Sequence, residues 1–126
     1  MLATLGSEPA EAVRFALVTL KDARLAWDLA QSLALDDDRV WDELIKVYQK
    51  IDPVAVLPIH ERLVEKDLVD AKPQRYRVAA RRLATMRKLA AGSGMAEAVD
   101  DLIAHLRETH LRRPRLQQEF TRAGLP

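Results

Sequence analysis

The sequence predicts an all-α protein. Apolar residues recur with helical spacing along almost the whole chain of 126 residues, and no segment shows the two-residue alternation of a strand. Ala, Leu and Arg, which favour helices, outnumber the β-branched and aromatic residues that favour strands. Proline, glycine and aspartate stand between the periodic segments. Together these observations predict helices over 8–20, 22–35, 38–51, 53–69, 73–91, 95–111 and 114–123.

The first three predicted helices begin after residues suited to capping a helix N-terminus. Ser7 precedes the first helix, and Asp22 precedes the second. The run Asp36-Asp37-Asp38 ends the second helix and starts the third, where carboxylates accept hydrogen bonds from free backbone N–H groups. The side chains expected to face inward from these helices are Val13, Ala16, Leu17, Leu20, Ala23, Ala26, Trp27, Ala30, Leu33, Ala34, Val40, Leu44, Val47, Tyr48 and Ile51.

Proline and glycine set the later boundaries. Asp52-Pro53 places a capping residue before a proline at the first helical position, which begins the fourth helix. Pro58 lies five residues further on, so we expect a kink near Val54. The remaining breaks are Lys72-Pro73, Gly92-Ser93-Gly94, Arg113-Pro114 and Gly124.

The apolar stripes of these helices define the expected core. The residues that we expect at its centre are Trp27, Leu33, Val40, Leu44, Leu63, Leu83, Leu102 and Leu106. Two interpretations of Trp27, Trp41 and Tyr48 stay open, because large aromatic side chains anchor partners in peptide grooves and also dominate cores. A core that seals the first hairpin is the favoured interpretation in a chain with only 5% aromatic residues.

Short connections require that neighbouring helices run antiparallel. Pairing them gives hairpins of about 34 residues, the length of a tetratricopeptide-like (TPR-like) repeat. The prediction is therefore a single all-helical domain over 1–126, in which antiparallel hairpins stack as a short TPR-like α-α superhelix. A compact helical bundle is the alternative architecture.

Several functional classes have no support in the sequence. The chain has no cysteine for a disulfide, a thiolate zinc site or a cysteine nucleophile. No secretory signal opens it, and its longest apolar run, 54–59, is far too short to span a membrane. No serine lies at a strand-to-helix turn and no phosphate-binding loop is present. We expect a cytoplasmic protein that is not an enzyme, has no cofactor and does not bind membranes.

The histidines and aspartates do not predict a metal site. His60 and His110 lie on apolar arcs, which favours packing roles, and His105 stands one turn after Asp101. Because His105 and His110 are five residues apart, they point about 140° apart on a regular helix and cannot share a metal ion. The run Asp36-Asp37-Asp38 lacks the glycine and glutamate positions of a calcium-binding loop.

The overall charge of +1 hides an uneven distribution. Residues 1–63 carry seven basic and eleven acidic side chains, whereas residues 64–126 carry thirteen basic and eight acidic ones. Arg77, Arg81 and Lys88 fall within about 40° of one another on the helix over 73–91, opposite its apolar stripe. A second basic group precedes the last helix and consists of Arg112, Arg113 and Arg115.

These basic residues have two interpretations. The six residues are a candidate contact surface for an anionic partner, either nucleic acid or an acidic protein face. The other interpretation assigns them no binding function: they form a solvated helix face, whose flanking Arg75, Arg82 and Arg87 pair with acids on adjacent helices. The expected acids are Glu61, Glu65, Asp100 and Asp101.

The last third of the chain contains the segments Tyr76-Arg-Val-Ala79-Ala80, Leu106-Arg107-Glu-Thr-His110 and Arg112-Arg-Pro-Arg-Leu116. In these segments it resembles the C-terminal helical region of bacterial SWIM zinc-finger proteins. The resemblance is strongest over 70–126 and extends over 22–126. It implies a TPR-like C-terminal fragment of a longer bacterial protein, without the zinc motif, because that motif requires cysteine.

The sequence thus favours a protein–protein interaction module without enzymatic activity. Its expected partner is another protein or the rest of its own parent chain, and self-association through apolar surface near the first helix is a further expectation. The alternative is an accessory nucleic-acid-binding module that uses the basic helix 72–88 and the basic turn 112–115.

Overall fold

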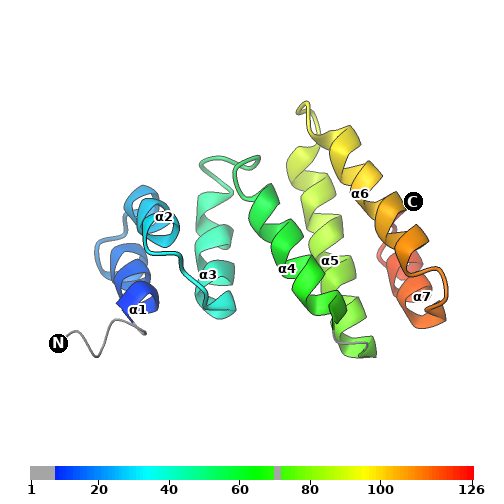
Figure 1. The fold of residues 1–126 in the computed structure, drawn as a ribbon. Helices are drawn as coiled ribbons and strands as arrows, with labels where there is room; N and C mark the ends of the chain where they lie inside the picture. The colour runs from blue at the N-terminus through cyan, green and yellow to red at the C-terminus, as the bar shows by residue number, and fades with distance from the viewer. Residues whose placement is uncertain (1–7, 70–71) are drawn as a thin grey trace. The chain divides into compact units, whose positions relative to one another are not determined.

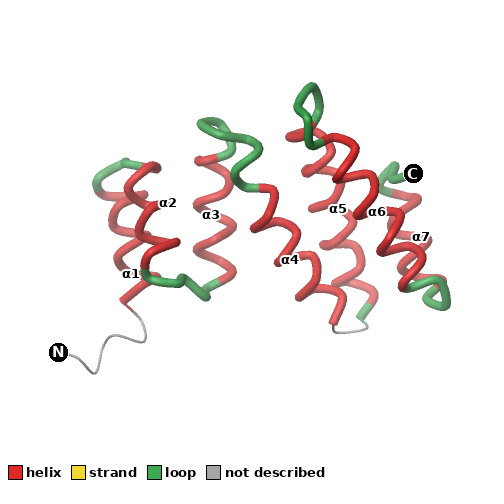
Figure 2. The backbone as a smooth tube through the Cα atoms, turned by 45° about the horizontal axis from the view of Figure 1, so that its top comes forward, coloured by secondary structure: helices red, strands yellow, loops and turns green. Residues whose placement is uncertain are grey.

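The computed structural model describes residues 8–69 and 72–126, and within these ranges every regular element is a helix (Figures 1 and 2). The all-α prediction is confirmed. The elements are α1 (Glu8–Arg14), η2 (Phe15–Thr19), α2 (Ala23–Ser32), α3 (Asp38–Tyr48), α4 (Leu57–Val69), α5 (Pro73–Ala90), α6 (Ala96–Thr109) and α7 (Pro114–Arg122).

The chain divides between Asp52 and Pro53 into two compact units. We call them the N-terminal unit and the C-terminal unit. The Asp-Pro pair that the sequence marks as its fourth boundary is therefore also the division between the units. The expectation of a single domain over 1–126 stays a prediction.

Aromatic side chains hold the N-terminal unit together. Trp41 is buried, and its indole Nε1 donates a 2.8 Å hydrogen bond to the Leu35 carbonyl oxygen. Trp27 stacks on Tyr48 with ring centroids 4.3 Å apart and meets the edge of Trp41 at 5.7 Å. This cluster joins α2 to α3. Trp41 is buried, as the core interpretation predicts, whereas Trp27 and Tyr48 are half-buried. The guanidinium of Arg14 adds a 2.8 Å ion pair to Glu43, which links α1 to α3.

Two of the predicted caps form as expected. The Asp22 carboxylate accepts a hydrogen bond from the Leu25 N–H at 3.0 Å and caps α2. The Asp37 carboxylate accepts from the N–H groups of Arg39 and Val40 and caps α3. The cap predicted at Ser7 lies outside the described residues.

Five apolar residues that were expected to face inward are exposed. Leu20 is 51% exposed because the chain switches from α- to π-helical winding at Phe15, which changes the angular spacing of the side chains that follow. Leu33 is 41% exposed because α2 ends at Ser32 and the chain then turns through Ala34, which has a φ of +52° and is exposed as well. The other two are Val47, near the C-terminal end of α3, and Ile51, beyond that end.

In the C-terminal unit, α5 packs against α4, α6 and α7. Its apolar stripe is buried and consists, as predicted, of Tyr76, Ala79, Leu83, Met86 and Ala90. The neighbouring helices contribute Val64, Leu68, Val99, Ile103, Leu106, Leu116 and Phe120 to the same core. Of the expected core residues, Leu63 is buried, whereas Leu102 is partly buried against the core.

The fourth helix begins later than predicted. Residues 53–56 form turns, and α4 starts at Leu57. Pro58 therefore lies in the first turn, where its missing N–H has no intrahelical acceptor to serve. The kink expected near Val54 is wrong, because no helix precedes Pro58 that this proline would bend.

A buried carboxylate joins α4 to α5. One oxygen of Asp67 lies 3.6 Å from a terminal nitrogen of Arg75, and the other lies 3.5 Å from Nε of Arg82. The side chain of Arg82 is only 14% exposed, so this contact is held largely away from water. The sequence predicted that the flanking arginines pair with acids of adjacent helices. Asp100, one of the four acids expected, pairs with Arg87, whereas Asp67 was not among them.

Gly92 ends the turn after α5 with a φ of +77°, whereas the φ of Gly94 lies outside the left-handed region. A Cβ at either position meets no atom within 4 Å. We therefore expect Gly92→Ala to lower the free energy of unfolding by about 1 kcal/mol through backbone strain alone. Gly94→Ala is the matched control and should stay within about 0.5 kcal/mol of the parent chain. Equal effects of the two substitutions in urea denaturation would contradict this account.

Replacement of Asp67 should weaken the α4–α5 hairpin. Asp67→Ala leaves the enclosed Arg82 without this carboxylate. We expect the free energy of unfolding to fall by roughly 2 kcal/mol, which is less than for a fully buried ion pair because Arg75 is half exposed. Glu65→Ala, at an exposed position of the same helix, is the control and should change stability little. Urea denaturation followed by circular dichroism measures both variants, and an unchanged midpoint for Asp67→Ala would refute a stabilising role.

Candidate functional site

The basic face predicted on the fifth helix is present on α5. Arg77, Arg81 and Lys88 are all exposed, and the side chain of Arg77 is 55% exposed. They lie on the side of α5 away from the buried stripe of Tyr76 and Leu83. The helical period that buries the apolar side chains thus presents these three cations to solvent.

A hollow of about 470 Å³ lies between α5 and α7, lined by Arg77, Ala80, Arg81, Glu119, Arg122 and Ala123. The side chain of Glu119 is only 6% exposed and lies between two arginines. One of its oxygens is 3.7 Å from Nε of Arg77, and the other is 3.4 Å from a terminal nitrogen of Arg122. Three arginines and a single carboxylate therefore line this hollow, which leaves it with an excess of positive charge.

A second hollow, of about 420 Å³, continues along α5. Its lining consists of Ala84, Arg87, Lys88, Ala91, Ala96, Asp100, Ala123 and Leu125. Arg87 donates a 2.9 Å hydrogen bond to Asp100, so this arginine is neutralised within the fold. Because Ala123 lines both hollows, we treat them as one surface and call it the α5 groove.

Two cations of the α5 groove stand out from the rest. Within the described part of the chain, the side chains of Arg81 and Lys88 form no hydrogen bond and no ion pair. Arg77 and Arg122 share Glu119, and Arg87 holds Asp100. The groove therefore contains charge that the fold itself does not neutralise.

The basic turn before α7 is less uniform than the sequence suggested. Arg112 and Arg115 are exposed, as a contact surface requires. Arg113 is half-buried, and its guanidinium donates a 3.2 Å hydrogen bond to the Leu68 carbonyl oxygen near the end of α4. Arg113 thus ties the turn to α4 and belongs to the fold as much as to any surface.

Sequence reasoning did not place Glu119 and Arg122 in the site. The sequence does indicate that Glu119 and Arg122 pair with each other, since residues three apart on a helix are neighbours and an acid–base pair at that spacing is a common surface motif. The pairing of Glu119 with Arg77, however, depends on how α7 packs against α5, and no local pattern contains that information.

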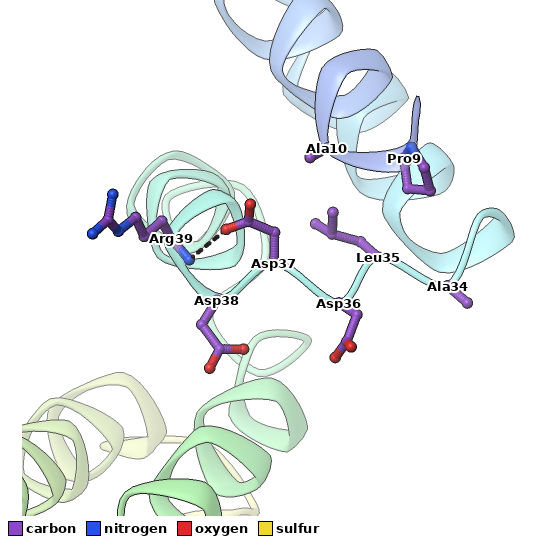
Figure 3. A pocket seen from close by; sticks show the side chains of 8 residues that line it. All are labelled: Pro9, Ala10, Ala34, Leu35, Asp36, Asp37, Asp38 and Arg39. Atoms are coloured by element: carbon purple, nitrogen blue, oxygen red, sulfur yellow. Dashed lines mark hydrogen bonds between the residues drawn. The ribbon is translucent and has the colours of Figure 1, made fainter. Parts of the chain in front are cut away.

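A hollow of about 720 Å³ in the N-terminal unit lies beside the loop between α2 and α3 (Figure 3). Asp37 points toward α3, where it caps the helix, whereas the carboxylates of Asp36 and Asp38 point to the other side of the loop (Figure 3). In the described ranges, no three histidine or acidic side chains lie close enough together to hold a metal ion. This loop serves as a helix-capping turn, as the sequence predicted.

The three histidines differ in environment. His60 is buried in α4, and His105 is exposed on α6. His110 is half-buried at the end of α6, and burial lowers its pKa below the ordinary value, with the positive charge of Arg113 and the neighbouring His105 acting in the same direction.

Comparisons with protein-family models, with curated proteins and with solved structures find no match to this chain. The resemblance to the C-terminal region of SWIM zinc-finger proteins therefore stays a prediction. Among the helices described, none is both long and apolar enough to cross a membrane.

The lowered pKa of His110 predicts a pH dependence of stability. The unfolded chain binds a proton at His110 more readily than the folded chain does, so stability is fully present above the ordinary histidine pKa of about 6.5 and decreases as the pH falls through the folded-state value. His110→Asn should flatten the slope of unfolding free energy against pH below 6.5 relative to the slope of the parent chain. Parallel profiles for the parent chain and His110→Asn would rule out this contribution.

Proposed function

We propose that this chain is a non-enzymatic protein–protein interaction module that binds its partner through the α5 groove. One observation carries the proposal: Arg81 and Lys88 are exposed along a hollowed surface and are not neutralised within the described fold. Exposed cations without partners in the fold stabilise it little, and they are available to an anionic partner.

The buried ionisable residues favour a binding role over catalysis. Asp67 and Glu119 are both buried, and each lies between two arginines. Both carboxylates are thus engaged in ion pairs within the fold, which favours a structural role for them over a catalytic one.

The proposed setting is a short TPR-like array in a bacterial cytoplasmic protein of the SWIM zinc-finger family, in which this chain forms a C-terminal region. The hairpin of α4 and α5 supplies the repeat-like unit. The partner is another protein or the rest of the parent chain. Self-association stays an additional proposal, supported by the exposed apolar side chains Phe15, Val18 and Leu20 near α1.

The second candidate is an accessory nucleic-acid-binding module that uses residues 72–88 and 112–115. Its support is the basic excess of the second half of the chain and the exposure of Arg81, Lys88, Arg112 and Arg115. Against it stands the lining of the α5 groove, which contains no aromatic side chain on which bases could stack.

A photocrosslinking experiment distinguishes these functions. A photoreactive amino acid at Ala84, on the groove floor, should form a discrete protein adduct in cells that carry the gene, because a bound partner contacts this position. The same residue at Ala104, an exposed position of α6, is the control and should form none.

The triple substitution Arg77→Glu, Arg81→Glu and Lys88→Glu should abolish the adduct at Ala84, because reversed charges repel an anionic partner. Mass spectrometry identifies the adduct, and nuclease treatment tests its nature. An adduct that nuclease removes supports the nucleic-acid function. Equal labelling at both positions, or none at Ala84, eliminates the groove as the binding surface.

A further inference from the structure

We infer that the α5 groove binds an acidic α-helix of a partner protein, whose carboxylates pair with Arg77, Arg81 and Lys88. This inference rests on the proposed interaction function and specifies the chemistry of the partner. It is carried by the charge of the groove, by the spacing of its cations and by the helices that form its walls.

The cations of α5 set the spacing of the partner's acids. Arg77 and Arg81 are four residues apart, and Lys88 follows seven residues later, so all three lie on one side of the helix. They extend over about 16 Å of helix axis at 1.5 Å per residue. A helix that lies along α5 presents carboxylates at matching intervals when its acids are also four and seven residues apart.

The groove has excess positive charge along its length. Its lining contains the cations Arg77, Arg81, Arg87, Lys88 and Arg122. Against these five stand two carboxylates, those of Glu119 and Asp100.

The contacts of Arg77 and Arg122 with Glu119 leave room for another carboxylate. They measure 3.7 and 3.4 Å, whereas strong guanidinium–carboxylate hydrogen bonds are about 2.8 Å long. A guanidinium group has five N–H donors in a planar fork that fits a carboxylate with two parallel hydrogen bonds. Arg77 and Arg122 can therefore keep Glu119 and still donate to a partner.

The shape of the groove suits a partner helix whose backbone lies close to α5. Beside the cations, α5 contributes Ala80 and Ala84, and Ala91 follows its last residue. Ala123 lies beyond the C-terminal end of α7 on the facing wall. Their methyl groups occupy little space, and a groove between two helices is a common seat for a third helix. The alanines set the distance of approach, and the cations select an acidic partner.

A helix satisfies the charge pattern better than nucleic acid does. Phosphates follow one another at short, regular intervals along a nucleic-acid strand, so a strand in the groove would also bring phosphates near Asp100 and Glu119. A helix can place its acids opposite the cations alone. Tyr76, the aromatic residue nearest to the basic side chains in the sequence, is buried and offers no surface for base stacking.

Synthetic peptides test the inference directly. The probe is a fluorescent alanine-rich helix with three glutamates that are four and seven residues apart, and the control peptide has the same composition with glutamates two and seven apart, on opposite faces. Fluorescence anisotropy with the full chain at low salt should show at least tenfold tighter binding of the matched peptide. Equal binding of the two peptides would overturn the inference.

Substitutions then locate the binding surface. Arg81→Glu should weaken the matched peptide at least tenfold, whereas Arg112→Glu, an exposed arginine outside the groove, should change binding less than twofold. Circular dichroism checks that both variants remain folded. Equal losses for both variants would show that only overall charge matters, and would overturn the inference.

Two competing occupants are tested in parallel. Labelled single- and double-stranded DNA and RNA that bind more tightly than the matched peptide, and that lose binding in Arg81→Glu, would replace the acidic helix with nucleic acid. A self-associated species that sedimentation detects in the parent chain and not in Arg81→Glu would replace it with a second copy of the chain.

The proposed function and this inference fail in different ways. A groove-dependent protein adduct at Ala84 together with no preference for the matched peptide leaves the interaction function intact and eliminates the acidic helix. Absence of both results eliminates the groove as a binding surface altogether.

Discussion

The structure of the C-terminal unit depends on the burial of one apolar stripe of α5. Leu83 and Ala79 at its centre are completely buried, because α4, α6 and α7 all pack against this helix. Full burial of a leucine side chain contributes roughly 2 kcal/mol, more than any exposed ion pair. Once the stripe is buried, the helical period leaves the opposite side of α5 in solvent, so the placement of Arg77, Arg81 and Lys88 follows from the core.

The basic side chains of the C-terminal unit differ in their partners. Those beside the buried stripe join helices: Arg82 faces Asp67, and Arg87 holds Asp100. Arg107 secures the C-terminal residues by donating to the carbonyl oxygens of Leu125 and Pro126, and its guanidinium lies 5.6 Å from the centre of the Phe120 ring. The groove cations Arg81 and Lys88 have no comparable role within the described fold.

The sequence was sufficient for the elements whose boundaries are chemical and local. Asp22 and Asp37 cap helices, Pro73 and Pro114 begin helices, and Gly92 takes the positive φ that few other residues tolerate. The helical spacing of apolar residues predicted burial wrongly where a helix ends or changes its winding, because the apolar pattern continues past the last turn. The pattern therefore predicted Leu33 as a core residue although it lies outside α2. Leu20 follows a π-helical turn, which no sequence rule predicted.

The candidate site shows the same division between local and tertiary information. Arg77, Arg81 and Lys88 were predictable because they share one helix, whereas Glu119 and Asp67 were not, because their partners lie on another helix.

The mutual position of Arg77 and Arg81 also has an energetic consequence. Like charges four residues apart on a helix repel each other, so this face slightly weakens the isolated fold. A carboxylate placed between them converts the repulsion into attraction, and a ligand that binds only the folded chain stabilises it. The feature that is unfavourable in the free protein is therefore the one that favours an acidic partner.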